Sequence, residues 1–331
     1  MRLSAQLELG NKIANMSMQW ILPRFISTSF IILVDAKPLI ATLAGNNIMK
    51  RYRVFQFDFD SHPKLLTMII NNDADETVKK LHIENTTKIY TQFFGQFGLF
   101  NSEFKINNFI EIGPKPFSVV AFHNKFQEQM RNSFIIGAYY PSLTAACALG
   151  ERILNHLIIK LRDEFKNTPQ YKKVSRKDSF DNWDLAIDTL RSWSVLLPKT
   201  GEYYIELKGL RNKAIHFNPE IDDNDHELAL SAIKILTNII NEQFPGGGNK
   251  PWFIPKMRGE SYIKKEYEND PFIKNIYLPN CYLVGPYHTI KNVNNKLILN
   301  DDNSYSNNEI TDEEFLELRY NKKQADNPRL E

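Results

Sequence analysis

The chain has 331 residues, of which 42% are hydrophobic and 12% aromatic, and this composition argues against a disordered or low-complexity protein. The 41 basic and 39 acidic residues nearly balance, so the net charge gives no sign of nucleic-acid binding, although a local basic patch could still bind RNA. The two cysteines, Cys147 and Cys281, lack metal-ligand spacing, which argues against a disulfide framework and a zinc site.

Residues 1–48 differ in composition from the rest of the chain, and we expect an N-terminal extension that the core fold does not require. They contain the apolar stretch "WILPRFISTSFIILVDAKPLIATLAG" at 20–45. Two prolines, Arg24, Asp35 and Lys37 interrupt it, so its charge-free runs are well short of the ~20 residues of a spanning helix. We therefore expect a cytoplasmic protein without stable membrane association.

Residues 49–122 are expected to form a small mixed α/β region. From Arg51 to Asp60 three phenylalanines alternate with polar residues, the period of a half-buried strand. Short apolar and aromatic runs come next, broken by Asn, Gly and Pro. Asp58, Asp60 and His62 could form a metal site near the strand end, but the alternation already explains both aspartates as residues on the solvent-exposed face of a strand. We expect no metal site.

Residues 123–245 have helical periodicity. Helices are expected at about 125–140, 141–165, 181–197, 202–217 and 222–244, with a polar, basic loop at 166–179. On the second helix one apolar stripe contains Leu143, Cys147, Leu154, Leu157, Ile158, Leu161 and Phe165. Short links between amphipathic helices predict a four- to five-helix bundle.

Residues 246–331 are expected to form a linker and an irregular C-terminal extension. "FPGGGNKP" at 244–251 is predicted to be a flexible linker. "IKNIYLPNCYLVGP" is predicted to form a strand pair, and the end, which is rich in Asn and Asp, is predicted to be loosely ordered. The fold class is α+β: a helical bundle with smaller flanking regions.

The stretch "LRNKAIHF" at 210–217 contains the candidate chemistry. On a helix Asn212 and His216 share a face, whereas Arg211 lies about 140° from His216. A distorted turn or a second subunit would be needed to bring Arg211 and His216 together. An imidazole at a helix C-terminus beside a permanent cation suits metal-independent RNA cleavage: a base removes the 2′-hydroxyl proton, and Arg stabilises the charge on the phosphorane.

Arg211, four intervening residues and His216, within a predicted bundle at 125–245, resemble the R-x4-6-H motif of the HEPN superfamily. "ACALGERILNHL" is similar to the first bundle helix of such domains. The resemblance implies a homodimeric, metal-independent ribonuclease of toxin–antitoxin or phage-defence systems, without a cofactor. Carried over, Arg211 would stabilise the phosphate, His216 would transfer the proton and Asn212 would orient the pair or the RNA. Glu151 would be an acidic residue that faces the motif.

Other interpretations of the same residues stay open, and so does whether the protein is an enzyme. Arg211 and His216 would otherwise be a solvated arginine and a capping histidine, in a non-catalytic dimerisation or docking bundle; a nucleotide-binding sensor is a third possibility. The basic stretch could guide RNA by counterion release, or be a solvated loop; its residues are Lys172, Lys173, Arg176 and Lys177. An antitoxin or nucleotidyltransferase partner would be a separate chain.

Overall fold

A computed structural model describes residues 47–326, apart from 57, 216–219, 258, 294–295 and 302. The predicted N-terminal extension, with its apolar stretch, and His216 therefore lie outside the described residues. The described part is mostly helical with two small antiparallel sheets, which fits the predicted α+β class. No helix within that part is both long and apolar enough to cross a membrane.

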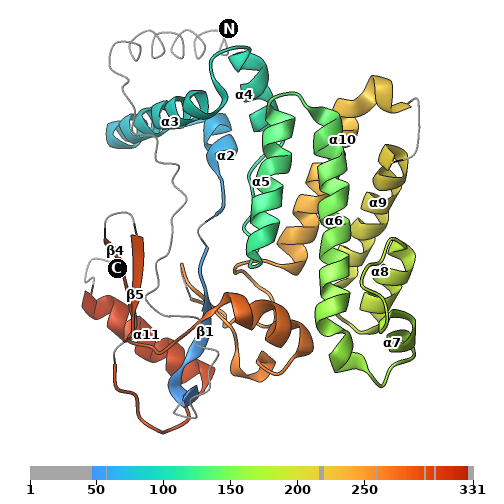
Figure 1. Ribbon diagram of the computed structural model, residues 1–331. Coiled ribbons are helices and arrows are strands. Elements are labelled where there is room, and N and C mark those ends of the chain that lie inside the picture. Colours follow the sequence, from blue (N-terminus) through green and yellow to red (C-terminus); the bar gives the residue numbers. More distant parts are fainter. Residues whose placement is uncertain are drawn as a thin grey trace.

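The helix α6 (Tyr139–Leu161) is the centre of a helical bundle. It packs against α5 (Ala121–Ile135), α8 (Trp183–Ser192), α9 (Pro198–Ile215) and α10 (Glu220–Gln243), as Figure 1 shows. Six residues of its predicted stripe are 2% exposed or less: Leu143, Cys147, Leu154, Leu157, Ile158 and Leu161. Full burial of one such side chain contributes about 1.5–3 kcal/mol, so this stripe holds the bundle together.

The corner between α5 and α6 lies earlier in the chain than predicted. Gly137 has a φ of 84°, a conformation that favours glycine, and it ends the first helix. The next helix starts at Tyr139 rather than at Pro141. Pro141 is tolerated there because the N–H groups of a helix's first turn have no partner within the helix.

The predicted basic loop at 166–179 is partly helical. A 3-10 turn, η2 (Arg162–Phe165), is followed by the short helix α7 (Pro169–Val174), which begins with proline. Val174 is fully buried. The Arg162 side chain donates to the carbonyl oxygens of Val174 and Lys177, at 3.2 and 2.6 Å. Burial of Val174 and these hydrogen bonds explain why the segment is ordered.

The strand predicted from Arg51 to Asp60 is wrong beyond Val54. After a 3-10 turn, η1 (Asn47–Met49), β1 covers only Arg51–Val54, and Phe59 is 57% exposed rather than inward-facing. The region then continues with α2 (His62–Thr67), α3 (Glu76–Phe97) and α4 (Ser102–Glu111). It is therefore largely helical in its described part.

The strand β1 is the centre of a three-stranded antiparallel sheet. It pairs with β2 (Ser261–Tyr262) and with β3 (Tyr282–Val284), with Arg53 opposite Tyr262 and Tyr282. The sheet therefore joins residues from the predicted N-terminal region and the predicted C-terminal extension (Figure 1). The division of the chain into separate domains stays a prediction.

The predicted strand pair near residue 280 is wrong. Its first half is a short π-helix, η4 (Ile273–Tyr277), followed by a 3-10 turn, η5 (Leu278–Asn280). Ile273, Ile276 and Tyr277 are at most 3% exposed and belong to the same core as the bundle. Only the second half becomes a strand, and its partner is β1.

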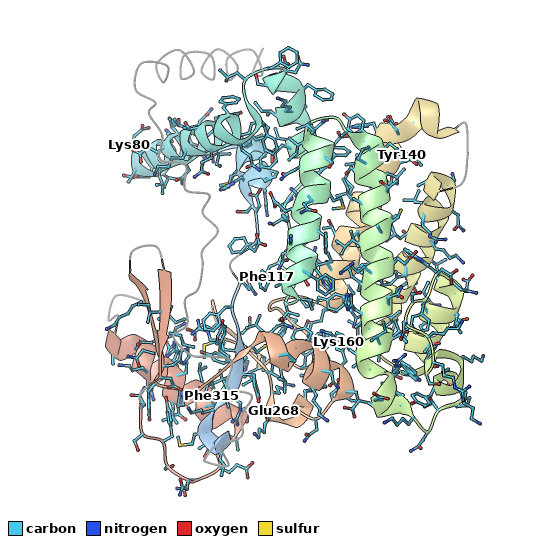
Figure 2. All side chains as sticks on the ribbon, in the orientation of Figure 1. Lys80, Phe117, Tyr140, Lys160, Glu268 and Phe315 are labelled. Atoms are coloured by element: carbon cyan, nitrogen blue, oxygen red, sulfur yellow. The ribbon has the colours of Figure 1, made fainter. Side chains whose placement is uncertain are left out.

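The C-terminal extension is not irregular throughout. It contains η3 (Lys265–Tyr267), a hairpin of β4 (Thr289–Val293) and β5 (Lys296–Asn300), and α11 (Asp312–Asp326). Thr311 and Glu314 exchange backbone-to-side-chain hydrogen bonds at the start of α11, a capping box. Phe315 is fully buried against Tyr262, with ring centroids 5.0 Å apart, and Figure 2 shows it between α11 and the sheet.

Candidate functional site

Arg211 lies on the inward face of α9. The buried residues Thr200, Tyr204, Leu207 and Ala214 lie on one face of this helix, and Arg211, four residues after Leu207 and three before Ala214, falls on the same stripe. Its side chain is only 20% exposed. The guanidinium group therefore faces neighbouring helices instead of extending into solvent.

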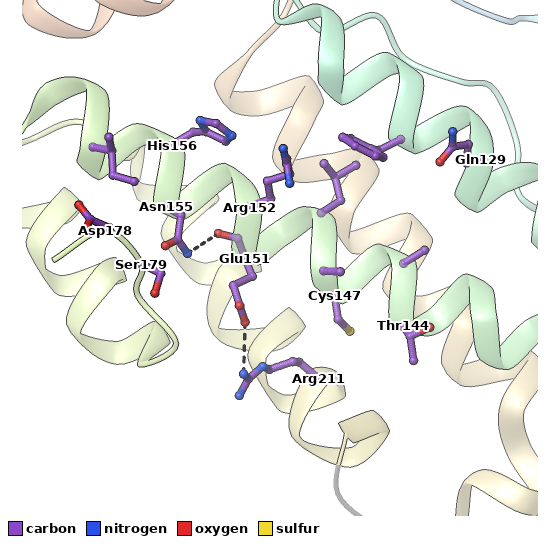
Figure 3. A pocket seen from close by; sticks show the side chains of 15 residues that line it. Gln129, Thr144, Cys147, Glu151, Arg152, Asn155, His156, Asp178, Ser179 and Arg211 are labelled. Carbon is purple, nitrogen blue, oxygen red and sulfur yellow. Dashed lines mark hydrogen bonds and ion pairs between the residues drawn. The ribbon is translucent and has the colours of Figure 1, made fainter.

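Glu151 of α6 binds this guanidinium group. Its Oε2 atom lies 3.2 Å from Arg211 Nη2 and accepts a hydrogen bond from Trp183 Nε1 at 2.9 Å. The guanidinium carbon of Arg211 lies 5.8 Å from the centre of the Trp183 ring, within cation–π range. Figure 3 shows the Glu151–Arg211 pair. The predicted proximity of Glu151 to the motif arginine is thus present, and the tryptophan of α8 completes the contact.

Two local features bring these three side chains together. Asn182 caps α8, its side chain accepting from Leu185 N at 3.0 Å, and so fixes Trp183 at the first position of the helix. A Cβ atom at Gly150 would lie 2.7 Å from Leu207 and 3.2 Å from Trp183. Glycine at this position therefore lets α6 approach α8 and α9 closely enough for Glu151 to reach both partners.

Arg211 keeps hydrogen-bond donors that Glu151 does not use. Within the described part of the chain only its Nη2 atom forms a hydrogen bond, and its buried Nε atom has no acceptor there. A guanidinium group has five N–H donors. Arg211 can therefore hold an anion such as a phosphate while Glu151 keeps it oriented.

Arg211 and Glu151 line a groove on the outer side of α6, which we call the α6 groove (Figure 3). Its volume is about 810 Å³. Thr144, Ala145 and Ala148 line it with small side chains. Other walls come from α5, through Phe126 and Gln129, from α6, through Arg152, Asn155 and His156, and from the segment after α7, through Asp178 and Ser179.

Asn155 fixes the wall beside α7. Its Nδ2 atom donates to the carbonyl oxygens of Glu151 and Phe180, at 2.9 and 3.0 Å, and its Oδ1 atom accepts from Phe180 N at 2.6 Å. These hydrogen bonds hold the segment that contains Asp178 and Ser179 against α6. The sequence signal is a polar residue inside the otherwise apolar "RILNHLII"; we did not predict Asn155 because its partner is 25 residues away.

His156 also lines the groove, on the side of α5. Its ring lies 4.7 Å from the Phe122 ring. Burial lowers the pKa of His156, and the neighbouring charges of Arg152 and Lys160 lower it further. Both effects favour the neutral imidazole, which can accept a hydrogen bond or stack.

The structure does not bring all the predicted site residues to the groove. His216 lies outside the described residues. Asn212 is exposed and does not line the groove. The four predicted RNA-binding residues are likewise exposed, on α7 and just after it, and none lines the groove: Lys172, Lys173, Arg176 and Lys177.

The candidate metal residues near β1 form ion pairs instead. Lys115 Nζ lies 2.6 Å from Asp58 and 2.7 Å from Glu128. His62 Nδ1 lies 3.0 Å from Asp60, and this hydrogen bond raises the pKa of His62. Across the residues that the structure describes, no group of three or more potential metal ligands is found.

The chain matches no protein-family model, no curated protein and no solved structure. The resemblance to the HEPN superfamily therefore stays a prediction. Any functional conclusion rests on the sequence motif and on the geometry of the α6 groove.

Proposed function

We propose that this protein is a HEPN-like, metal-independent endoribonuclease of a microbial toxin–antitoxin or phage-defence system. The observation that carries the proposal is the contact of Arg211 with Glu151 and Trp183. An arginine on the buried stripe of a helix, oriented by a carboxylate and a ring, faces an open groove and keeps donors that have no acceptor among the described residues. Such a preorganised cation is what a developing phosphorane requires.

The proposed reaction is a transesterification within the RNA. His216 removes the proton of a 2′-hydroxyl group, and the oxygen attacks the adjacent phosphorus. Arg211 donates N–H groups to the non-bridging oxygens as negative charge builds there. The bond from phosphorus to the 5′-oxygen breaks, and that oxygen takes a proton. The products are a 2′,3′-cyclic phosphate and a 5′-hydroxyl end.

Glu151 is a positioning residue in this scheme. Its side chain is 34% exposed and that of Arg211 is 20% exposed, so the ion pair contributes only about 1 kcal/mol or less to stability. Its main effect is geometric. Glu151 and Trp183 restrict the rotation of a long side chain, so that the guanidinium group faces the groove before RNA binds.

We further propose that the protein acts as a cytoplasmic homodimer, with any antitoxin on a separate chain. Large exposed apolar side chains lie around the α5–α6 corner, including Phe104, Ile136 and Tyr140, which are 45–55% exposed. Tyr140 donates a hydrogen bond to the carbonyl oxygen of Ala214 at 3.4 Å, so this corner adjoins the motif end of α9. The same apolar corner also suits the alternative, a non-catalytic bundle that docks to another protein.

Expression of the wild type and variants in bacterial cells tests the proposal. The wild type should arrest growth and degrade cellular RNA, whereas His216→Ala and Arg211→Ala should do neither. His82→Ala, which alters a histidine on α3 outside the groove, is the matched control and should behave as the wild type. Growth arrest by His216→Ala equal to that of the wild type would contradict the proposal and favour a docking module.

A further inference from the structure

A row of nitrogen-bearing side chains follows one face of α6. Arg152, His156 and Lys160 are spaced four residues apart, so they share a helix face and rise about 6 Å from one to the next. Arg152 and Lys160 are exposed. Neither forms an ion pair with any residue for which the structure gives a position. Their charges are therefore available to an anionic ligand.

Aromatic rings of α5 hold this row in place. The Arg152 guanidinium carbon lies 5.2 Å from the centre of the Phe126 ring and 5.8 Å from that of Phe122. The Phe122 ring also contacts the ring of His156, with centroids 4.7 Å apart and planes tilted by 43°. Arg152 is thus oriented by rings, which leave its N–H donors free, instead of by a carboxylate, which would occupy them.

The row continues into the α6 groove. Arg152, His156 and Phe126 line the same groove as Arg211, and Figure 3 shows Arg152 on α6 and Arg211 on α9, with Glu151 between them. Of the carboxylates that line the groove, Glu151 is already bound to Arg211, and Asp178 lies in the segment between α7 and α8. A polyanion entering the groove is therefore favoured on the α5 side.

Figure 2 shows the direction that such a ligand would follow. Tyr140, which bonds to Ala214 near the motif, and Lys160 lie at opposite ends of α6. Arg152 and His156 lie between them in sequence. The row therefore leads away from Arg211 along the helix axis, which gives an extended strand a continuous path.

We propose that Arg152, His156 and Lys160, together with Phe122 and Phe126, form a binding subsite for single-stranded RNA. The subsite would hold the nucleotides next to the cleaved phosphate, and in this respect it rests on the proposed ribonuclease function. Arg152 and Lys160, about 12 Å apart along the helix, suit two phosphates of one strand. The partly exposed rings of Phe122 and Phe126 give unpaired bases a surface on which to stack. A duplex presents no free base faces to these rings, so the subsite selects single strands.

Fluorescence anisotropy with the full chain tests this subsite. The probe is a short labelled oligouridine with 2′-O-methyl groups, which lacks the 2′-hydroxyl that the proposed reaction needs. We expect Arg152→Gln to weaken binding about tenfold and to reduce the salt dependence by about 0.7 in log–log slope, the value for one phosphate contact on a single strand. Lys160→Gln should weaken binding several-fold.

Lys234→Gln is the matched control for Lys160→Gln, because Lys234 is an exposed lysine on α10, away from the groove; it should bind as the wild type does. Circular dichroism checks that each variant is folded. If Arg152→Gln does not fold, Lys160→Gln, which changes an exposed residue, tests the subsite in its place. Unchanged affinity of the folded variants, or no binding by the wild type, would overturn the subsite. Arg152-dependent binding without any cleavage of ordinary RNA would uphold the subsite and overturn the proposed reaction.

Discussion

Substitution of Glu260 tests how the two ends of the described chain are held together. The Glu260 carboxylate is 6% exposed, lies 3.0 Å from Arg53 Nη2 and accepts from Arg319 at 2.8 and 3.0 Å. It also accepts from the Tyr262 hydroxyl at 2.7 Å. One carboxylate therefore joins β1, β2 and α11, with two guanidinium groups that are each 6% exposed as whole residues.

Glu260→Gln keeps the shape of the side chain and removes its charge. Loss of one partner of a buried ion pair costs about 3–5 kcal/mol, because the remaining charge stays buried without compensation. The amide oxygen of Gln still accepts one hydrogen bond, so we expect a loss of about 3 kcal/mol in the free energy of unfolding. Chemical denaturation, followed by circular dichroism, measures this loss as a lower midpoint with an unchanged slope.

Glu266→Gln is the matched control. The Glu266 side chain is 67% exposed and lies 3.4 Å from Lys264, so its removal should cost less than about 0.5 kcal/mol. If Glu260→Gln unfolds within about 1 kcal/mol of the wild type, the carboxylate does not neutralise the two arginines as described. The reasoning about this cluster would then be refuted.

Three further predictions concern the groove and the fold. Trp183→Phe removes the donor to Glu151 and should cost about 1–2 kcal/mol of stability; RNA cleavage should fall several-fold through kcat, and an unchanged kcat would exclude a positioning role. Gly150→Ala places a Cβ atom 2.7 Å from a side chain of α9 and should destabilise the protein by about 1–3 kcal/mol. Gly209→Ala is the control, because its Cβ atom meets nothing within 4 Å; it should stabilise the protein by about 0.5–1 kcal/mol. Unfolding midpoints of both variants equal to that of the wild type would contradict this reasoning. Burial, with the nearby positive charges, lowers the pKa of His288 from 6.5 to about 4. Between these two pH values the unfolded chain binds more protons than the folded chain does. The free energy of unfolding should therefore fall by up to about 3 kcal/mol as the pH drops from 6.5 to about 4. His288→Gln should flatten this pH dependence, and a stability profile as steep as that of the wild type would contradict the assignment.

The helical bundle could be predicted because its signal is local. The stripe that contains Leu154 and Ile158 repeats within one helix, and both residues are fully buried. The start of α11 was missed although Thr311 and Glu314 form a capping box there. The Asn- and Asp-rich stretch before this helix favoured a disordered end, and the burial of Phe315 against Tyr262 depends on a strand about 50 residues away.

Strand limits could not be predicted for a related reason. The alternation of phenylalanines up to Phe59 is a strand pattern, but β1 ends at Val54, and β2, its neighbour, has only two residues. Strand length here depends on hydrogen-bond partners from the far end of the chain. Local periodicity does not contain that information.

The candidate site likewise contains residues that the sequence identifies and residues that only the structure identifies. Arg211 follows from the motif, and Glu151 follows from the resemblance, whereas the hydrogen bond from Trp183 depends on how closely α8 approaches α6. Arg152 was not predicted as a binding residue, because its orientation comes from two rings on α5. Interhelical contacts of this kind follow from tertiary packing, which a motif does not encode.

Analysis of the ends of RNA incubated with purified protein in EDTA tests the central claim most directly. Wild-type protein should leave 2′,3′-cyclic phosphate and 5′-hydroxyl ends, because the proposed reaction uses His216 and Arg211 and no metal ion. Arg211→Ala should lower the cleavage rate at least about a hundredfold, the effect expected on removal of one oxyanion donor. Intact RNA with the wild type, or equal cleavage by Arg211→Ala, would contradict the account.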